Sequence, residues 1–316
     1  MTSLRRSLPA LLLVPLFLLA GCASRPAATE AAPTSSLAPM EPPAIGDVPL
    51  LSRVDDRTLP IEAYLLSGEQ FRQYDAAQTV LVARCVRGFG LSYTRPDGAG
   101  ASAETQTTHR YDPIEIADVT VNGYHSPDPD RGKKPAGAPS LSADLTTVLG
   151  SGLGPDGKPA PGSASTLRGK PLPPGGCIGA AQKELTSRGG TGRDADVAVG
   201  INYEGFERSM KDTRVKAAFQ DWSRCMADRG HSYATPGDAL KDPRWAATAR
   251  ATAEEIATAT ADVECKARTN VVGTWFTVET AYENELIRRR LPELTAVKAD
   301  NEAMLELARS VTASGS

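Results

Sequence analysis

RCVRGFGLSY at residues 84–93 and RCMADRGHSY at residues 224–233 share one pattern. Arg, Cys, an apolar residue, Gly, Ser and Tyr recur at the same offsets. In each copy the cysteine ends a stretch whose apolar residues recur at helical spacing, which places it in the last helical turn. Gly90 or Gly230 then supplies the positive φ with which the chain leaves the helix. The pattern predicts a duplicated unit.

Each copy has a second cysteine downstream, in a stretch of Ala, Glu and Lys with helical character. The repeat selects one of the three ways to pair four cysteines. We predict a bond from Cys85 to Cys177 and another from Cys225 to Cys265, each joining two helices of its own half. A zinc site is the alternative, but zinc ligands usually come in close pairs such as C-x₂-C, and here no two cysteines are close and none has a neighbouring histidine.

The fifth cysteine, Cys22, belongs to the N-terminus. Arg5 and Arg6 precede an apolar run over residues 8–20, which is short for a membrane span of about 20 residues but typical of a signal peptide. The sequence LAGC at 19–22 resembles the lipobox of bacterial lipoproteins. This resemblance implies cleavage before Cys22 and a diacylglycerol on its sulfur, whose two acyl chains give stable anchoring. An ordinary secretory signal with a chance cysteine is the alternative.

Composition sets the compartment and the class of partner. An even number of remaining cysteines in an exported chain indicates disulfides. The net charge is −3, and cleavage would remove Arg5 and Arg6 and no acidic residue. A mildly acidic protein lacks the basic surface that nucleic acid or anionic lipid requires, so we expect no nucleic-acid partner. We expect a location at the outer face of the cell membrane, held there by the Cys22 lipid.

The expected fold is mainly α: a disulfide-linked helical domain with an internal duplication and long Gly/Pro-rich loops. The aromatic content is only 5%, while Gly and Pro number 28 and 24, so we expect a modest core supported by cross-links. The predicted organisation is a lipoprotein signal peptide (1–21), a lipidated flexible tether rich in Pro, Ala, Ser and Thr (22–58), a first repeat half with an irregular loop insertion (59–200), and a second repeat half with the C-terminal helices (201–316).

Local signals place the main elements. Ser67 and Gln70 form a predicted capping box at the start of the first helix. Residues 96–176 are expected to be irregular, interrupted by a β-strand or ligand-facing loop that carries Ile114, Ile116, Val119 and Val121. Helical pattern is expected at 177–185, lapses over 187–200, and resumes from about residue 204, with further helices over 245–268 and 271–290.

The last stretch has a heptad-like pattern. Its repeating positions are Leu294, Val297, Asn301, Met304, Ala308 and Val311. Two and a half heptads do not establish a coiled coil. We expect a terminal helix packed on its own domain, with dimerisation as the alternative.

No established catalytic, cofactor or phosphate-binding motif is present, and we assign no catalytic residue, cofactor or metal. The glycines of Gly150–Gly154 are expected to form a linker. His231 occupies the position of Leu91 in the first copy, so a structural role is expected. His109 and His125 are expected to be solvated loop residues. The pairs Asp128/Asp130 and Asp194/Asp196 lack the spacing of a calcium loop and are expected to be exposed loop acids.

A resemblance supports this architecture. The helix end W-x-x-C-M at 222–226, the DVECK segment at 262–266, and Trp275-Phe276 with Glu279 downstream, together with the lipobox, resemble a group of uncharacterised lipoproteins of actinobacteria. The resemblance covers most of the chain outside the Gly/Pro-rich middle. It implies the compartment and the helical architecture, and it brings no activity.

Three hypotheses for function follow. The first is a lipid-anchored extracytoplasmic binding or scaffolding module, not an enzyme, which serves a transporter or envelope protein as partner. The second is a hydrolase of envelope polymers that uses His125 with Asp128 and Asp130 as acid and base. The third is the solute-binding subunit of an importer, which ranks lower because such proteins alternate strands and helices across two lobes.

Overall fold

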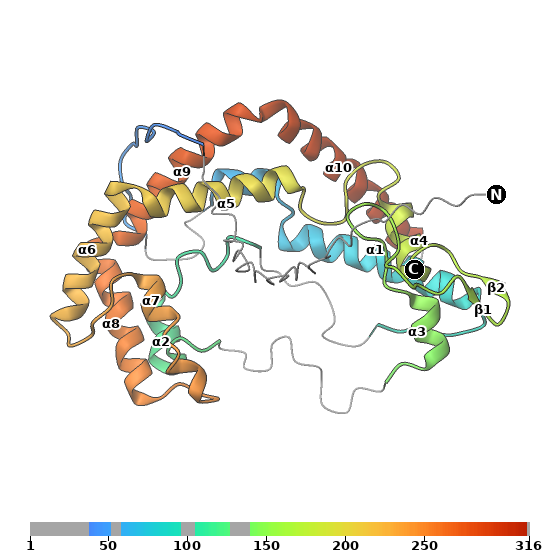
Figure 1. Ribbon diagram of the computed structural model, residues 1–316, viewed down its shortest axis with the longest axis horizontal. Helices are drawn as coiled ribbons and strands as arrows, with labels where there is room; N and C mark the ends of the chain where they lie inside the picture. Colours follow the sequence, from blue (N-terminus) through green and yellow to red (C-terminus); the bar gives the residue numbers. More distant parts are fainter. Residues whose placement is uncertain (1–37, 52–57, 96–104, 127–139, 315–316) are drawn as a thin grey trace, which may run out of the picture. The chain divides into compact units, whose positions relative to one another are not determined.

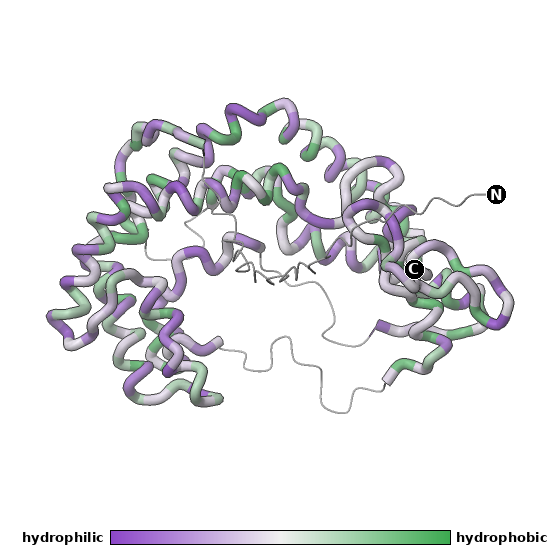
Figure 2. Tube along the Cα trace, in the orientation of Figure 1, coloured by the Kyte–Doolittle hydropathy of each residue, from purple (hydrophilic) through white to green (hydrophobic). Residues whose placement is uncertain are grey.

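The computed structural model describes residues 38–51, 58–95, 105–126 and 140–314. The chain divides into two units, Met1–Pro39 and Met40–Ser316, and the fold below belongs to the second. Its described part is mainly helical, as predicted. Apolar and polar residues interleave along the helices (Figure 2), and no described helix combines the length and apolarity needed to cross a membrane.

Figure 1 shows the order of the elements. The α-helices are α1 (Gly68–Arg87), α2 (Ile116–Asn122), α3 (Ala143–Leu149), α4 (Gly176–Leu185), α5 (Asp196–Lys211), α6 (Thr213–Ala227), α7 (Pro236–Leu240), α8 (Ala253–Thr269), α9 (Val271–Arg289) and α10 (Leu291–Ser314). Two 3₁₀-helices are η2 (Pro60–Tyr64) and η3 (Trp245–Ala247). The short antiparallel strands β1 (Thr166–Leu167) and β2 (Lys170–Pro171) pair with each other.

One core lies among α1, α3, α4 and α10. The predicted capping box starts α1, since Ser67 Oγ accepts from the Gln70 amide and Gln70 Oε1 accepts from the Ser67 amide. Tyr74 and Leu81 of α1 pack with Leu185 and Met304 in this core. The predicted disulfide between Cys85 and Cys177 joins α1 to α4, with a Cα–Cα distance of 5.6 Å.

The second core lies among α6, α8 and α9. Trp222 and Met226 are fully buried there, and the Trp275 ring makes edge contacts with Tyr111 and Phe219. The predicted disulfide between Cys225 and Cys265 joins α6 to α8, with a Cα–Cα distance of 5.7 Å. Both predicted pairings are therefore confirmed.

The duplicated turn is the same in both copies. The Leu91 amide donates to the Val86 carbonyl, and the His231 amide donates to the Met226 carbonyl. Gly90 and Gly230 have φ values of 73° and 85°. Both are Schellman turns, which satisfy the last carbonyls of a helix and need a residue with positive φ. The repeat thus specifies a helix end whose last turn contains a disulfide-bonded cysteine.

Several expected elements differ from those observed. The predicted strand or loop around Val119 is helix α2, because Val119 packs into a small core with Ala259 of α8, while Gly123 ends the helix with φ 57°. α5 begins at Asp196, within the stretch where the pattern lapses. The heptad-like face of α10 packs against α1 and α4, with five of its six positions buried or nearly so and Val297 half-buried.

The segment 40–51, here named the strap, lies on the helices although it falls within the predicted tether. Met40 and Ile45 pack against the helical cores, and Leu51 is buried. Arg214 of α6 donates to the Pro43 carbonyl at 2.9 Å, and the Asn270 side-chain amide donates to the Pro49 carbonyl at 3.1 Å. Residues 40–51 therefore belong to the packed unit Met40–Ser316, although the prediction begins the folded part at residue 59.

Candidate functional site

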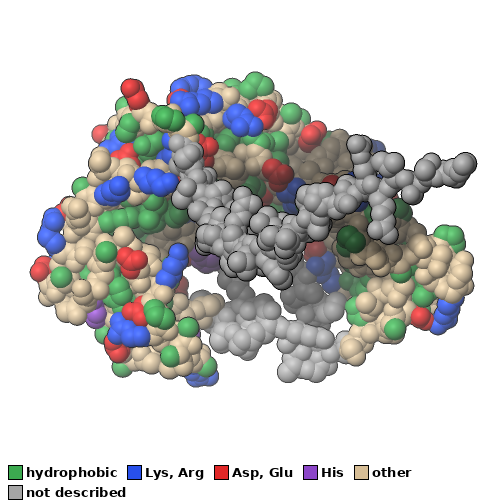
Figure 3. All heavy atoms as spheres, in the orientation of Figure 1, with side chains coloured by type: hydrophobic (Ala, Val, Ile, Leu, Met, Phe, Trp, Pro, Cys, Tyr) green, Lys and Arg blue, Asp and Glu red, His purple; other side chains and the backbone are tan. Residues whose placement is uncertain are grey.

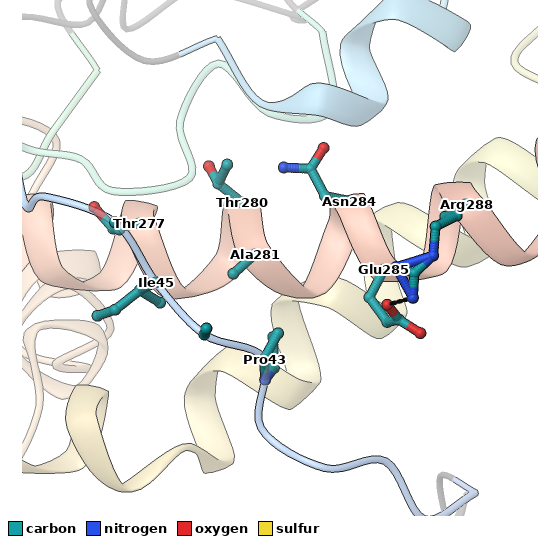
Figure 4. Close-up of a pocket in the computed structure, with 10 residues that line it drawn as sticks. Pro43, Ile45, Thr277, Thr280, Ala281, Asn284, Glu285 and Arg288 are labelled. Carbon is teal, nitrogen blue, oxygen red and sulfur yellow. Dashed lines mark hydrogen bonds and ion pairs between the residues drawn. The ribbon is translucent and has the colours of Figure 1, made fainter.

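A cleft of about 430 Å³ lies between the strap and α9 (Figure 4). One wall is the strap and the other is the outer face of α9. The lining residues are Pro43, Ala44, Ile45, Gly46, Thr277, Thr280, Ala281, Asn284, Glu285 and Arg288. The volume falls in the range of ligand and peptide sites.

Helical spacing explains why α9 offers this wall. Thr277, Thr280, Ala281, Asn284 and Arg288 follow one another at intervals of three, one, three and four, so they share one face of the helix. The opposite face carries the buried residues of α9 and packs against α5 and α6. α9 therefore holds the core together on one side and leaves the other side open.

The polar groups of the cleft are only partly used within the chain. Thr280 Oγ1 is buried and has no hydrogen-bond partner, and the side chain of Asn284 is exposed. In Figure 4, Thr280 and Asn284 point from the same side of α9. At one end, Glu285 pairs with Arg289 and Arg288, which lower the pKa of its carboxyl.

The strap is fixed at its two ends. Asp212 accepts from Arg214 Nε at 2.9 Å and from the Tyr282 hydroxyl at 3.0 Å, which orients the guanidinium toward the Pro43 carbonyl. The pKa of the Asp212 carboxyl is lowered chiefly by its hydrogen bond from Arg214. Gly273 lets the other end approach, since a Cβ there would lie 2.0 Å from the Pro49 carbonyl oxygen. The cleft wall is therefore held by α6 and α9.

A buried polar network lies behind α9 and connects segments that are distant in sequence. Arg110 donates to Glu279 Oε1 and to Asn202 Oδ1, both at 2.5 Å, and Tyr111 donates to Glu279 Oε2 at 2.8 Å. Asn202 donates to the side chain of Gln106 at 3.3 Å. The network pins the turn over 105–111 between α5 and α9.

The same network extends to the segment before α1. Gln106 donates to Asp194 Oδ2 at 2.7 Å, and the Leu66 amide donates to Asp194 Oδ1 at 2.7 Å. Asp194 is 8% exposed, so the prediction that it is an exposed loop acid was wrong. Asp196, its predicted companion, is exposed and pairs with Arg193.

A second polar cluster lies at α8. Asp262 is fully buried and accepts from Trp222 Nε1 at 2.9 Å and from the Tyr124 hydroxyl at 3.2 Å. Lys266 lies 3.1 Å from Asp262 and donates to the Pro113 carbonyl. Burial raises the pKa of Asp262. These bonds fasten the segment before α2 and the turn after it to α6 and α8.

His125 belongs to the same region and is not the solvated loop residue that we expected. Its Nδ1 lies 2.7 Å from Oε1 of the fully buried Glu255, and its Nε2 lies 2.9 Å from the Thr248 carbonyl. The Tyr124 amide also donates to Glu255 Oε1 at 2.8 Å. The two acceptors raise the pKa of His125. His125 therefore fastens the turn after α2 to α8.

The remaining predicted residues are distributed over the chain. His231 contacts Thr258 Oγ1 through Nδ1 at 3.2 Å, a contact between the turn after α6 and helix α8 that fits the expected structural role. His109 lies 2.6 Å from Asp112 on an exposed turn. Asp128, Asp130 and Cys22 lie outside the described residues. His125 and His231 both contact α8, through Glu255 and Thr258, whereas His109 pairs with Asp112.

Two further expectations concern ligands. Across 38–51, 58–95, 105–126 and 140–314, no group of three or more His, Cys, Asp or Glu side chains is arranged to hold a metal ion. The glycines of Gly150–Gly154 are not a linker, because they pack closely on Gly175 and Gly176. The Gly152 amide donates to the Gly175 carbonyl, and a Cβ on Gly150 would lie 2.3 Å from that same oxygen.

Sequence reasoning missed both the cleft and the buried acids of α9. Glu279 and Glu283 stand four residues apart among apolar positions, and a pair of acids on the buried face of a helix is the signal that could have identified them. The strap carried no comparable signal, because its ends are held through backbone carbonyls.

The described surface carries charges of both signs (Figure 3). On the face that Figure 3 shows, basic and acidic side chains are interspersed. In comparisons with family models, curated proteins and solved structures, the chain has no match.

Proposed function

We propose that this protein is a lipid-anchored extracytoplasmic binding module that uses the cleft between the strap and α9 to contact a protein of the cell envelope. The observation that carries the proposal is the position of the cleft, one wall of which is the strap, which begins at Met40, in the sequence shortly after Cys22. Between Cys22 and Met40 the chain spans at most about 65 Å even when fully extended. A partner in the cleft would therefore lie near the membrane.

The disulfides support the extracytoplasmic compartment. Two bonds close loops of 92 and 40 residues, and bonds of this kind persist in oxidising environments. The lipobox-like sequence before Cys22 supports lipid anchorage, as derived above. Together they support a location at the outer face of the cell membrane.

A role in binding accounts best for how the ionisable groups are used. His125, Glu279 and Asp262 each contact two or more elements that are distant in sequence, and each contact stabilises the fold. None of them lines the cleft. The groups that do line it are hydroxyl, amide and ion-paired side chains, which suit recognition rather than proton transfer.

The anchor is tested first. Cells that express the protein are labelled with an alkyne analogue of palmitate, and the wild type is compared with Cys22→Ala. We expect label and membrane association only in the wild type. Equal labelling of both chains would overturn the assignment of Cys22.

The cleft is tested by photocrosslinking in intact cells. A photoreactive p-benzoylphenylalanine replaces the exposed Asn284 in the cleft, and a matched control replaces the exposed Glu306 on α10. We expect one discrete adduct from position 284 that position 306 does not give. Identical adducts from both positions, or no adduct at 284, would overturn the proposal that the cleft is the binding site.

A further inference from the structure

The middle of the strap offers unused backbone hydrogen-bonding groups. The amides and carbonyls of residues 44–48 make no hydrogen bond within the described chain. The two ends, at Pro43 and Pro49, are fixed through their carbonyls. The strap is therefore a short, immobilised stretch of backbone with free donors and acceptors, as at the edge of a sheet.

Residues 40–51 form neither a helix nor a turn, and Figure 4 shows the strap crossing α9 as an open trace. Pro43 and Ile45 are half-buried, while Ala44 and Gly46 are exposed, and Ile45 packs against the second core. Alternation with a period of two is the pattern of a half-buried strand. Successive amides of an extended stretch point to opposite edges, so each edge of the strap carries unused amides of residues 44–48.

α9 contributes polar side chains to the cleft that the strap also lines. Thr280 Oγ1 is buried without a partner, and Asn284 is exposed beside it (Figure 4). A hydroxyl and an amide at this position can bond to the backbone or side chains of a chain that lies along the strap. Backbone pairing would then supply affinity, and α9 would supply specificity.

We propose that the cleft binds an extended segment of a partner protein, which adds to the strap as a β-strand through the backbone groups of residues 44–48. This inference rests on the proposed binding function and names the kind of partner. Pro43 and Pro49 flank the free stretch and cannot donate. They limit the pairing to about five residues, which is the usual length of a strand.

The test uses the purified full-length lipidated protein in detergent and a phage library of random dodecapeptides as the probe. Selected peptides are synthesised, and their affinities are measured by calorimetry. Each peptide amide is then N-methylated in turn. We expect binding to weaken roughly two- to tenfold at alternate positions only, because alternate amides of a paired strand donate across the pair.

Two strap variants provide a matched comparison. Gly46→Pro and Asp47→Pro each remove one amide, and these amides point to opposite edges of the strap. A Cβ on Gly46 meets no atom within 4 Å, so the ring has space there. We expect one variant to lose affinity roughly two- to tenfold and the other to retain it.

Several outcomes would overturn the inference. The library could yield no binder, or N-methylation could weaken binding without alternation along the peptide. The two proline variants could lower the affinity equally. The selected peptides could also bind Asn284→Arg as tightly as they bind the wild type. Concentration-dependent dimers that Gly46→Pro or Asp47→Pro abolishes would assign the strap to a second copy instead. If position 284 gives a crosslink in cells but the purified protein binds no peptide, the extended segment is excluded as the ligand. The proposal that the cleft is a binding site would then still hold.

Discussion

Glu279 and Glu283 are both fully buried, one turn apart on α9, and among the described residues only the guanidinium of Arg110 donates to either carboxyl. The Ile61 amide donates to Glu283 Oε2 at 3.0 Å, and Glu283 Oε1 has no partner. Burial raises the pKa of Glu279 to about 7. Burial and the neighbouring charge of Glu279 raise the pKa of Glu283 to about 8. The folded protein therefore holds protons that the unfolded chain releases.

Glu283→Gln should make stability less dependent on pH. Because the pKa of Glu283 is 4.5 when unfolded and about 8 when folded, the stability from its neutral carboxyl is fully present below pH 4.5. It is lost progressively as pH rises toward 8. The glutamine stays neutral, so the decline in the free energy of unfolding between pH 5 and 8 should become shallower by up to about 1.4 kcal/mol per pH unit. Urea unfolding under non-reducing conditions measures this slope.

The control for this change is Glu306→Gln on the exposed side of α10. It removes the same charge without a buried site, so its slope should match that of the wild type. A slope for Glu283→Gln that equals the wild-type slope would show that Glu283 is ionised in the fold.

Arg110→Met should destabilise the fold more at pH 8 than at pH 5. The change leaves Glu279 without its cation in a fully buried site, which typically lowers the free energy of unfolding by about 3–5 kcal/mol. At pH 5 the unpaired carboxyl takes up a proton and the loss shrinks. Adding Glu279→Gln to Arg110→Met should restore at least half of the loss at pH 8. If the double variant is less stable than Arg110→Met, the charge is not the cause.

The features that sequence predicted are those with local causes. Each of these features depends on residues within a few positions of one another. They are the capping box at Ser67, the turns at Gly90 and Gly230, and the helix that carries each cysteine. The repeat then sufficed to pair Cys85 with Cys177 and Cys225 with Cys265, because each copy brings its own two helices together.

The polar networks and the strap could not be predicted in this way. Arg110 and Glu279 are 169 residues apart, and Leu66 and Asp194 are 128 apart. Such contacts depend on how the helices pack, which leaves no local pattern. The β-branched residues of α2 have a local preference for a strand. The segment is nevertheless helical, and Val119 packs on α8.

His125 should titrate above its ordinary pKa of 6.5. Both ring nitrogens face acceptors, the carboxylate of Glu255 and the carbonyl of Thr248, so the ring must be protonated to donate to both. The resulting stability is fully present below pH 6.5 and is lost as pH rises through the folded pKa. An NMR titration measures the pKa, with His125→Asn to assign the signals. Titration below 6.5 would contradict this geometry.

Gly273→Ala should loosen the strap without weakening α9. The added Cβ would lie 2.0 Å from the Pro49 carbonyl oxygen and 2.4 Å from Asn270 Oδ1, so the hydrogen bond between these two residues is lost. Chymotryptic cleavage at Leu50 and Leu51 should then quicken roughly two- to tenfold, which corresponds to one hydrogen bond.

Gly200→Ala on α5 is the matched control for this change. Its Cβ meets no atom within 4 Å, and alanine favours the helix by roughly 0.5–1 kcal/mol, so cleavage of the strap should keep its wild-type rate. Because the strap forms one wall of the cleft, Gly273→Ala should also lower the yield of the adduct from position 284, while Gly200→Ala should not. A strap cleaved at the same rate in both variants would show that the approach of Pro49 to Gly273 does not hold it in place.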